Sequence, residues 1–210
     1  TACYLFSMSL SRRDTLRLLL ATATLAPFSA WAQEKSARRS PKKGWAGNRP
    51  ESAKQFGCTW WYAWGGSGKG TEGYEFVPMA KGNRQPVGSS ELSQVSDSTA
   101  KCLLGFNEPE RTSQGNLTVA QAIEAWPLLV KFAEEKKLRL GSPSVSSDGG
   151  GGAWMREFME QAQRKKLRID FVTAHWYRSA DPGAFEDWLK ELNTNYKRPV
   201  WITEFNGMYS

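Results

Sequence analysis

The sequence predicts an α/β protein whose strands form a parallel sheet. Short apolar runs alternate with longer segments in which apolar residues recur every three or four positions, the spacing of an amphipathic helix. Strands separated by helices need crossover connections, and these place neighbouring strands parallel to one another. The 210 residues are enough for one domain with a sizeable core.

Seven apolar runs are predicted to be strands. They lie at 44–46, 58–64, 74–79, 102–106, 139–145, 170–177 and 199–205. Polar and aromatic groups follow at least five of these runs, which favours a (β/α)8 barrel, in which loops after the strands build the site. A doubly wound open sheet, with its site at one switch point, is the competing arrangement. Because the seventh run ends near Phe205, we expect this chain to lack the eighth strand–helix unit.

Three helices are predicted from their apolar spacing, and Thr118 could cap the first of them. The helices are marked by Val119, Ile123, Trp126, Leu129, Val130 and Ala133, by Trp154, Phe158 and Ala162, and by Phe185, Trp188, Leu189 and Leu192. The glycine-rich run from Asp148 to Gly152 lacks the setting of a dinucleotide-binding turn, and we interpret it as a flexible loop.

The first 32 residues resemble a twin-arginine export signal. Arg12 and Arg13 precede a moderately apolar stretch at 18–28, and Ala30 and Ala32 place small residues where a signal peptidase requires them. The apolar stretch is too short and too interrupted to remain in a bilayer, so we expect no stable membrane anchor. The predicted organisation is a signal peptide at 1–32, a basic linker at 33–43 and a folded domain at 44–210. We expect an exported protein, periplasmic or extracellular; the alternative is a disordered basic leader on a cytoplasmic protein.

The positive charge is concentrated outside the folded domain. The chain carries +7 overall, the linker at 33–43 contributes +4, and the domain itself is near +1. A nucleic-acid-binding domain would carry its basic excess on its own surface. We therefore expect no nucleic-acid partner.

The histidine and cysteine content limits the kinds of functional site that the chain can form. His175 is the only histidine, which excludes sites that need two imidazoles, and no phosphate-binding GxxxxGK[ST] segment occurs. We expect neither a metal nor a cofactor. Cys58 and Cys102 each precede an apolar run and are predicted to be buried thiols, although a disulfide between them stays open.

Two glutamates are the strongest functional signal. Glu108 and Glu204 each stand at the end of an apolar run, where a carboxylate is poorly solvated and held rigidly. A pair of such carboxylates, one protonated and one ionised, is the equipment for cleaving a glycosidic bond. Glu110 should point elsewhere, as a loop or capping acid.

Several motifs resemble those of glycoside hydrolase family 128, a family of endo-β-1,3-glucanases with a (β/α)8 fold. They are GFNEP at 105–109, DFVTAHWY at 170–177, WITEF at 201–205, WYAWG at 61–65, PM at 78–79 and GSP at 141–143. The likeness covers about residues 43–206. Family members tend to carry asparagine where Ala63 stands and tryptophan where Lys81 stands, so individual subsites should differ here.

The resemblance implies a role for each of several residues. Glu108 would be the general acid/base, Glu204 the nucleophile, and Asn107 a partner of the sugar hydroxyl next to the anomeric carbon. His175, Trp176 and Tyr177 end the sixth strand, and His175 and Tyr177 would contact sugar or orient the nucleophile. Retention requires carboxylates about 5–5.5 Å apart, which barrel strand exits can provide.

The aromatic cluster at 60–64 alternates between the two faces of its strand, so at most half can line one surface. We expect Trp60 in the core and Tyr62 and Trp64 in the cleft, where aromatic rings stack on glucose. The predicted function is retaining hydrolysis of β-1,3-glucan without metal or cofactor. The alternatives are a barrel glycosidase acting on another β-glucan or mannan, and a glucan-binding protein without turnover.

Overall fold

Parallel pairing runs through every sheet of the protein. The computed structural model describes residues 40–71, 73–97 and 99–207. The first sheet pairs β1 (Gly44–Ala46), β2 (Trp60–Tyr62) and β3 (Glu75–Phe76), and the second pairs β4 (Cys102–Leu103), β5 (Arg139–Val145), β6 (Phe171–Trp176) and β7 (Val200–Phe205). All five strand pairs are parallel. The predicted α/β class and its parallel strands are therefore confirmed.

A short parallel bridge connects the two sheets. Beyond β3, Met79 lies opposite Leu104. The Ala80 amide donates to the Leu104 carbonyl at 3.0 Å, and the Leu104 amide donates to the Pro78 carbonyl at 2.9 Å. The strands therefore follow one another in space in the order in which they occur along the chain.

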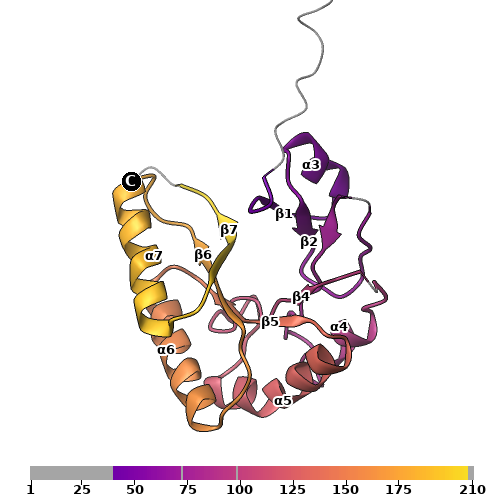
Figure 1. Ribbon diagram of the computed structural model, residues 1–210. Coiled ribbons are helices and arrows are strands. Elements are labelled where there is room, and N and C mark those ends of the chain that lie inside the picture. The colour runs from indigo at the N-terminus through magenta and orange to yellow at the C-terminus, as the bar shows by residue number, and fades with distance from the viewer. Residues whose placement is uncertain (1–39, 72, 98, 208–210) are drawn as a thin grey trace, which may run out of the picture. The chain divides into compact units, whose positions relative to one another are not determined.

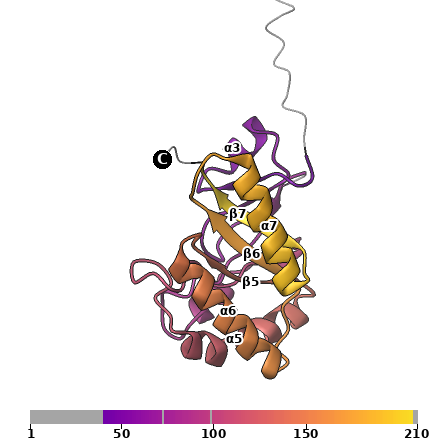
Figure 2. The same ribbon diagram turned by 90° about the vertical axis from the view of Figure 1, so that its left-hand side faces the viewer.

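The three long helices cover one side of the second sheet. They are α5 (Val119–Glu135), α6 (Gly149–Arg164) and α7 (Pro182–Tyr196), and they lie outside strands β4 to β7 (Figures 1 and 2). All three were predicted, and Thr118 caps α5 in a capping box with Gln121. Two short helices were not predicted: α3 (Pro50–Gln55), with proline in its first turn, and α4 (Ser89–Ser93).

The glycine-rich run is the first turn of α6, so its interpretation as a flexible loop was wrong. Asp148 is the N-cap and accepts a hydrogen bond from the Gly151 amide at 3.0 Å. A side chain at Gly151 would lie 2.2 Å from the Ser146 carbonyl oxygen, so this turn needs glycine to pack against the end of β5. Capping and close packing outweigh the low helix propensity of the four glycines.

The core has two layers, one on each side of the sheet. Leu103 and Val172 face outward and pack against α5 and α6 in a cluster that includes Trp126 and Phe158. Their strand neighbours face inward: Cys102, Leu104 and Phe171 join Tyr62, Val77 and Met79 in a second cluster. This alternation is the two-residue period of a strand.

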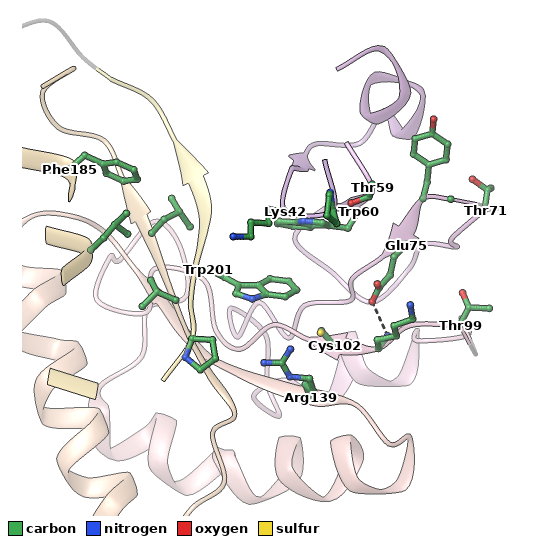
Figure 3. A pocket seen from close by; sticks show the side chains of 18 residues that line it. Lys42, Thr59, Trp60, Thr71, Glu75, Thr99, Cys102, Arg139, Phe185 and Trp201 are labelled. Carbon is green, nitrogen blue, oxygen red and sulfur yellow. Dashed lines mark hydrogen bonds between the residues drawn. The ribbon is translucent and has the colours of Figure 1, made fainter. Parts of the chain in front are cut away.

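A groove of about 1260 Å³ separates β7 and α7 from β2. Trp60 and Trp201 lie in it with ring centroids 5.2 Å apart, and Phe185 of α7 lies beyond β7 (Figure 3). Leu189 of α7 also lines the groove. Within residues 40–71, 73–97 and 99–207, the end strands β1 and β7 each pair with one neighbour only. Trp60, predicted to be in the core, is half-buried at this groove.

Cys58 and Cys102 are both buried free thiols, as predicted. Burial raises the pKa of the Cys102 thiol to about 11. Among the described residues, no helix is long and apolar enough to cross a membrane. The predicted signal peptide and most of the basic linker lie outside the described residues.

Candidate active site

Glu108 is held in a strained and buried conformation just beyond β4. Its φ is +37°, a value that costs a non-glycine residue roughly 1–3 kcal/mol. The Glu108 amide donates to the Ser144 carbonyl at 2.7 Å, which ties the turn to β5. Only 8 % of the residue is exposed. The chain therefore fixes where this carboxylate points.

Glu204 reaches the same place from β7. It pairs in register with His175 of β6, after a register shift between Ala174 and His175. Its side chain is 12 % exposed. Two strands that are distant in sequence thus bring both predicted glutamates to one end of the sheet.

Three side chains donate hydrogen bonds to Glu204. The Tyr62 hydroxyl and the Trp64 indole Nε1 donate to Oε1 at 3.0 and 2.8 Å, and the Tyr177 hydroxyl donates to Oε2 at 2.7 Å. Trp64 reaches this position with a φ of +49°. Because all three groups only donate here, they stabilise the ionised carboxylate.

The two phenols remain protonated donors. Burial raises the pKa of Tyr62, and the negative charge of Glu204 and its hydrogen bond act in the same direction. The pKa of Tyr177 is raised by burial first, and also by its hydrogen bond to Glu204. Neither hydroxyl ionises at neutral pH, so both continue to hold Glu204 in place.

His175 lies between the two glutamates. Its Nδ1 is 3.0 Å from Glu108 Oε1, and its Nε2 is 3.5 Å from Glu204 Oε1. The ring is fully buried, and among the described residues its Nε2 makes no hydrogen bond. One imidazole therefore spans the space between the two carboxylates.

Buried hydroxyls form the floor beneath these groups. The Ser144 hydroxyl donates to the Thr173 hydroxyl at 2.9 Å, and the Thr203 hydroxyl donates to Ser144 Oγ at 3.3 Å. Thr173 donates in turn to the Ser142 carbonyl at 2.7 Å. This network ties β5, β6 and β7 together below the site. Nothing in the sequence pattern indicated it.

The two glutamates open into one small pocket. It has a volume of about 230 Å³ and is lined by Trp64, Lys81, Asn107, Glu108, Gln114 and Glu204. Asn107 is 2 % exposed; its amide Nδ2 donates to Gln114 Oε1 at 3.3 Å, whereas its Oδ1 has no hydrogen-bond partner among the residues that the structure describes. A pocket with two carboxylates and unengaged polar groups suits a polar, hydroxyl-rich ligand.

Known proteins resemble this chain over most of its length. The family model described as "Glycosyl hydrolase catalytic core" matches residues 37–209. A search of curated proteins found no match. The endo-β-1,3-glucanase of Amycolatopsis mediterranei, crystallised with laminaritriose, is 30% identical over 80% of this chain and 72% of its own, with a TM-score of 0.67.

The chain belongs to glycoside hydrolase family 128.

Other members of the family resemble the chain to a similar degree. A curdlan-specific exo-β-1,3-glucanase from Blastomyces gilchristii is 30% identical, with coverage of 80% and 78% and a TM-score of 0.66. An oligosaccharide-binding protein of Trichoderma gamsii is 23% identical, with coverage of 81% and 68% and a TM-score of 0.62, a likeness of fold alone.

Of the predicted sugar contacts in this family 128 protein, Trp176 lies away from the site, whereas Tyr62 and His175 lie beside the glutamates. Trp176 is 1 % exposed and packs under α7 against Phe185 and Trp188, because strand alternation turns it away from the face of His175. Tyr62 and His175 are fully buried. They contact the glutamates, and their buried side chains offer no exposed surface to a sugar.

Sequence reasoning missed two residues around Glu108. Arg111 Nε lies 3.6 Å from Glu108 Oε2, and its guanidinium pairs with Asp148 at 2.7 Å. Gln114 lines the pocket from the same loop. Loop residues carry no periodic signal, and only their short distance from Glu108 along the chain could have indicated them. Glu110 accepts a hydrogen bond from the Ser146 amide, as expected of a loop-bracing acid.

Proposed function

We propose that this family 128 protein hydrolyses β-1,3-glucan with retention of configuration, using Glu204 as nucleophile and Glu108 as general acid/base. The observation that carries the proposal is the convergence of both carboxylates on His175 and on one pocket. The family relatives crystallised with laminari-oligosaccharides support the substrate class.

In the first step, Glu108 donates its proton to the glycosidic oxygen as the bond from that oxygen to the anomeric carbon breaks. A Glu204 oxygen bonds to the anomeric carbon and forms a glycosyl ester. In the second step, Glu108 takes a proton from water, the water oxygen bonds to the anomeric carbon, and Glu204 leaves as a carboxylate. Asn107 would bind the sugar hydroxyl next to the anomeric carbon.

His175 fits the resting state of this cycle. With its proton on Nε2, the neutral ring accepts from protonated Glu108 at Nδ1 and directs Nε2–H toward the Glu204 carboxylate. The same tautomer therefore favours one protonated and one ionised glutamate, which is the arrangement the first step needs.

We also propose that the seven strands correspond to seven of the eight in a (β/α)8 barrel. The groove between β7 and β2, with one-sided pairing at β1 and β7, supports this assignment. A further strand and helix would cover Trp201 and the apolar face of α7 there.

Export is likewise a proposal. The paired arginines at 12 and 13 and the alanines at 30 and 32 support a twin-arginine signal and a protein that acts in the periplasm or outside the cell. A polymeric glucan substrate would be met in those compartments.

Product analysis tests the proposed activity. Purified protein is incubated with laminarin, curdlan, cellulose and mannan, and soluble oligosaccharides are separated by chromatography, with Glu204→Gln as the control. We expect products from laminarin and curdlan only, and none from the variant. Release of soluble oligosaccharides from cellulose or mannan instead would mean that the protein hydrolyses another glucan or mannan. Retention on curdlan without any soluble product would favour a binding protein.

A further inference from the structure

The pocket beside the glutamates contains an ammonium group that the protein itself does not use. Lys81 lines this pocket and is half-buried. Its backbone carbonyl accepts a hydrogen bond from the Asn107 backbone N–H at 3.1 Å, which holds Lys81 against the turn that carries Glu108. Among residues 40–71, 73–97 and 99–207, no carboxylate lies within ion-pair distance of its Nζ, and no side chain hydrogen-bonds it.

Two further groups in the pocket are also unengaged. Gln114 accepts from Asn107 through Oε1, and its amide nitrogen has no partner within the described part of the chain. Asn107 Oδ1 is buried and accepts no hydrogen bond from the described part of the protein. The pocket therefore offers donors from Lys81 and Gln114 next to an acceptor from Asn107.

We infer that Lys81 and Gln114 form a hydrogen-bonding subsite for the hydroxyl groups of the glucosyl unit that adjoins Glu108 and Glu204. This inference rests on the proposed function and assigns two residues that determine how tightly the substrate is bound.

The mixture of donors and acceptors identifies the ligand chemistry. A hydroxyl group both donates and accepts, so neighbouring hydroxyls on one sugar ring can satisfy Lys81, Gln114 and Asn107 together. An anionic group only accepts and would leave Asn107 Oδ1 unpaired. It would also meet Glu108 and Glu204, which line the same pocket. A neutral, hydroxylated ring is therefore the better match.

The residues that line the pocket also fit a hydroxylated ligand. Trp64 is the only aromatic residue among the lining side chains, and its indole nitrogen is already bonded to Glu204. The other lining residues are all polar or charged, so polar contacts contribute to the affinity for a sugar at this place. Hydrogen bonds with a charged partner contribute more to affinity than neutral ones.

Binding in the absence of turnover gives the sharpest test. In the Glu204→Gln background, the affinity for laminaritetraose is measured by isothermal titration calorimetry for Lys81→Met, Lys81→Arg and Gln114→Leu. Lys131→Met is the matched control, because Lys131 lies on the exposed side of α5 and is 76% exposed. Circular dichroism melting confirms that each variant is folded. A glutamate-to-glutamine variant of the Amycolatopsis relative was crystallised with laminarihexaose, so such a background can retain ligand.

We expect Lys81→Met to weaken binding roughly tenfold to a hundredfold, which corresponds to one charged hydrogen bond. Lys81→Arg should stay near the parent value because it keeps a charged donor, and Lys131→Met should not change the affinity. Gln114→Leu should weaken binding less, since its donor is neutral.

Three results would overturn the inference, and they are distinguishable. If the parent binds laminaritetraose and Lys81→Met binds it equally well, the subsite is wrong while the proposed function stands. If the folded parent binds no laminari-oligosaccharide, the proposed function itself fails. If laminaritetraonic acid, which carries a carboxylate, binds tenfold more tightly than laminaritetraose and only with Lys81 present, Lys81 serves an anion instead.

Discussion

At the scale of single residues, the site depends on side chains that restrain two carboxylates from several directions. Glu204 accepts three hydrogen bonds, and Glu108 contacts His175 on one oxygen and Arg111 on the other. The family resemblance indicated His175 and Tyr177 at the end of the sixth apolar run. The sequence could not show that Trp176 points away from the site, because this depends on which of the two alternating sets of side chains in β6 faces the site.

Tyr177→Phe tests the restraint on Glu204. The change removes the 2.7 Å hydrogen bond to Oε2 and keeps the ring, so Glu204 loses a donor that orients the attacking oxygen. We expect kcat on laminarin to fall roughly tenfold to a hundredfold, from the worth of a hydrogen bond to a charged group. KM should change little.

Tyr196→Phe is the matched control, because Tyr196 lies at the C-terminal end of α7 and touches neither glutamate. Equal kcat values for native protein and Tyr177→Phe would mean that Glu204 does not need this donor.

At the scale of elements, the sequence predicted the bounds of strands with continuous apolar runs accurately, and it predicted irregular segments poorly. β5 has the predicted bounds, 139–145. The run at 102–106 contains only a two-residue strand, because Leu104 pairs with Met79 across a single bridge, and the next bridge, to Ser144, is made by Asn107 after the run. The start of α6 was missed because capping by Asp148 and close packing of Gly151 are tertiary effects that composition does not reveal.

Asp148 should make the stability of α6 dependent on pH. Its hydrogen bond from the Gly151 amide holds its pKa below the ordinary value, and the Ser146 hydroxyl and the Arg111 charge act in the same direction. A depressed folded-state pKa means that this stabilisation is complete above the unfolded-state value, near 3.9 for Asp, and is lost as pH falls through the folded-state value.

We expect Asp148→Ala to lower the free energy of unfolding by about 1 kcal/mol at pH 7, the usual cost of losing an N-cap. The difference between native protein and variant should shrink below about pH 4. Urea denaturation at pH 7 and pH 3 measures both values, with Asp187→Ala on the exposed face of α7 as control. A difference independent of pH would contradict the assigned cause.

At the scale of the whole molecule, the groove between β7 and β2 leaves apolar side chains of α7 and β7 accessible. Leu189, Phe185 and Ile202 line it together with Trp201. Unpaired strand edges and accessible apolar side chains favour association with another chain or with an added strand.

We therefore expect the chain to self-associate through this groove. Leu189→Lys places a charge in the groove and should increase the monomer fraction in sedimentation velocity. Leu128→Lys, at a 41% exposed position on α5, should leave the distribution unchanged. Fusing a strand–helix unit from the Amycolatopsis relative should also give monomers and raise Tm. Monomeric native chain, or equal effects of both lysine substitutions, would contradict this account of the groove.

The central claim is that Glu204 forms a covalent bond to the sugar while Glu108 transfers the proton. Incubation with a 2-deoxy-2-fluoro-laminaribiosyl fluoride traps that intermediate, because the fluorine slows its hydrolysis more than its formation. Mass spectrometry of the peptic digest should find one added 2-deoxy-2-fluoro-laminaribiosyl unit on the peptide that contains Glu204, and no adduct in Glu204→Gln. An adduct on Glu108, or laminarin products of inverted configuration with no adduct at all, would contradict the assignment.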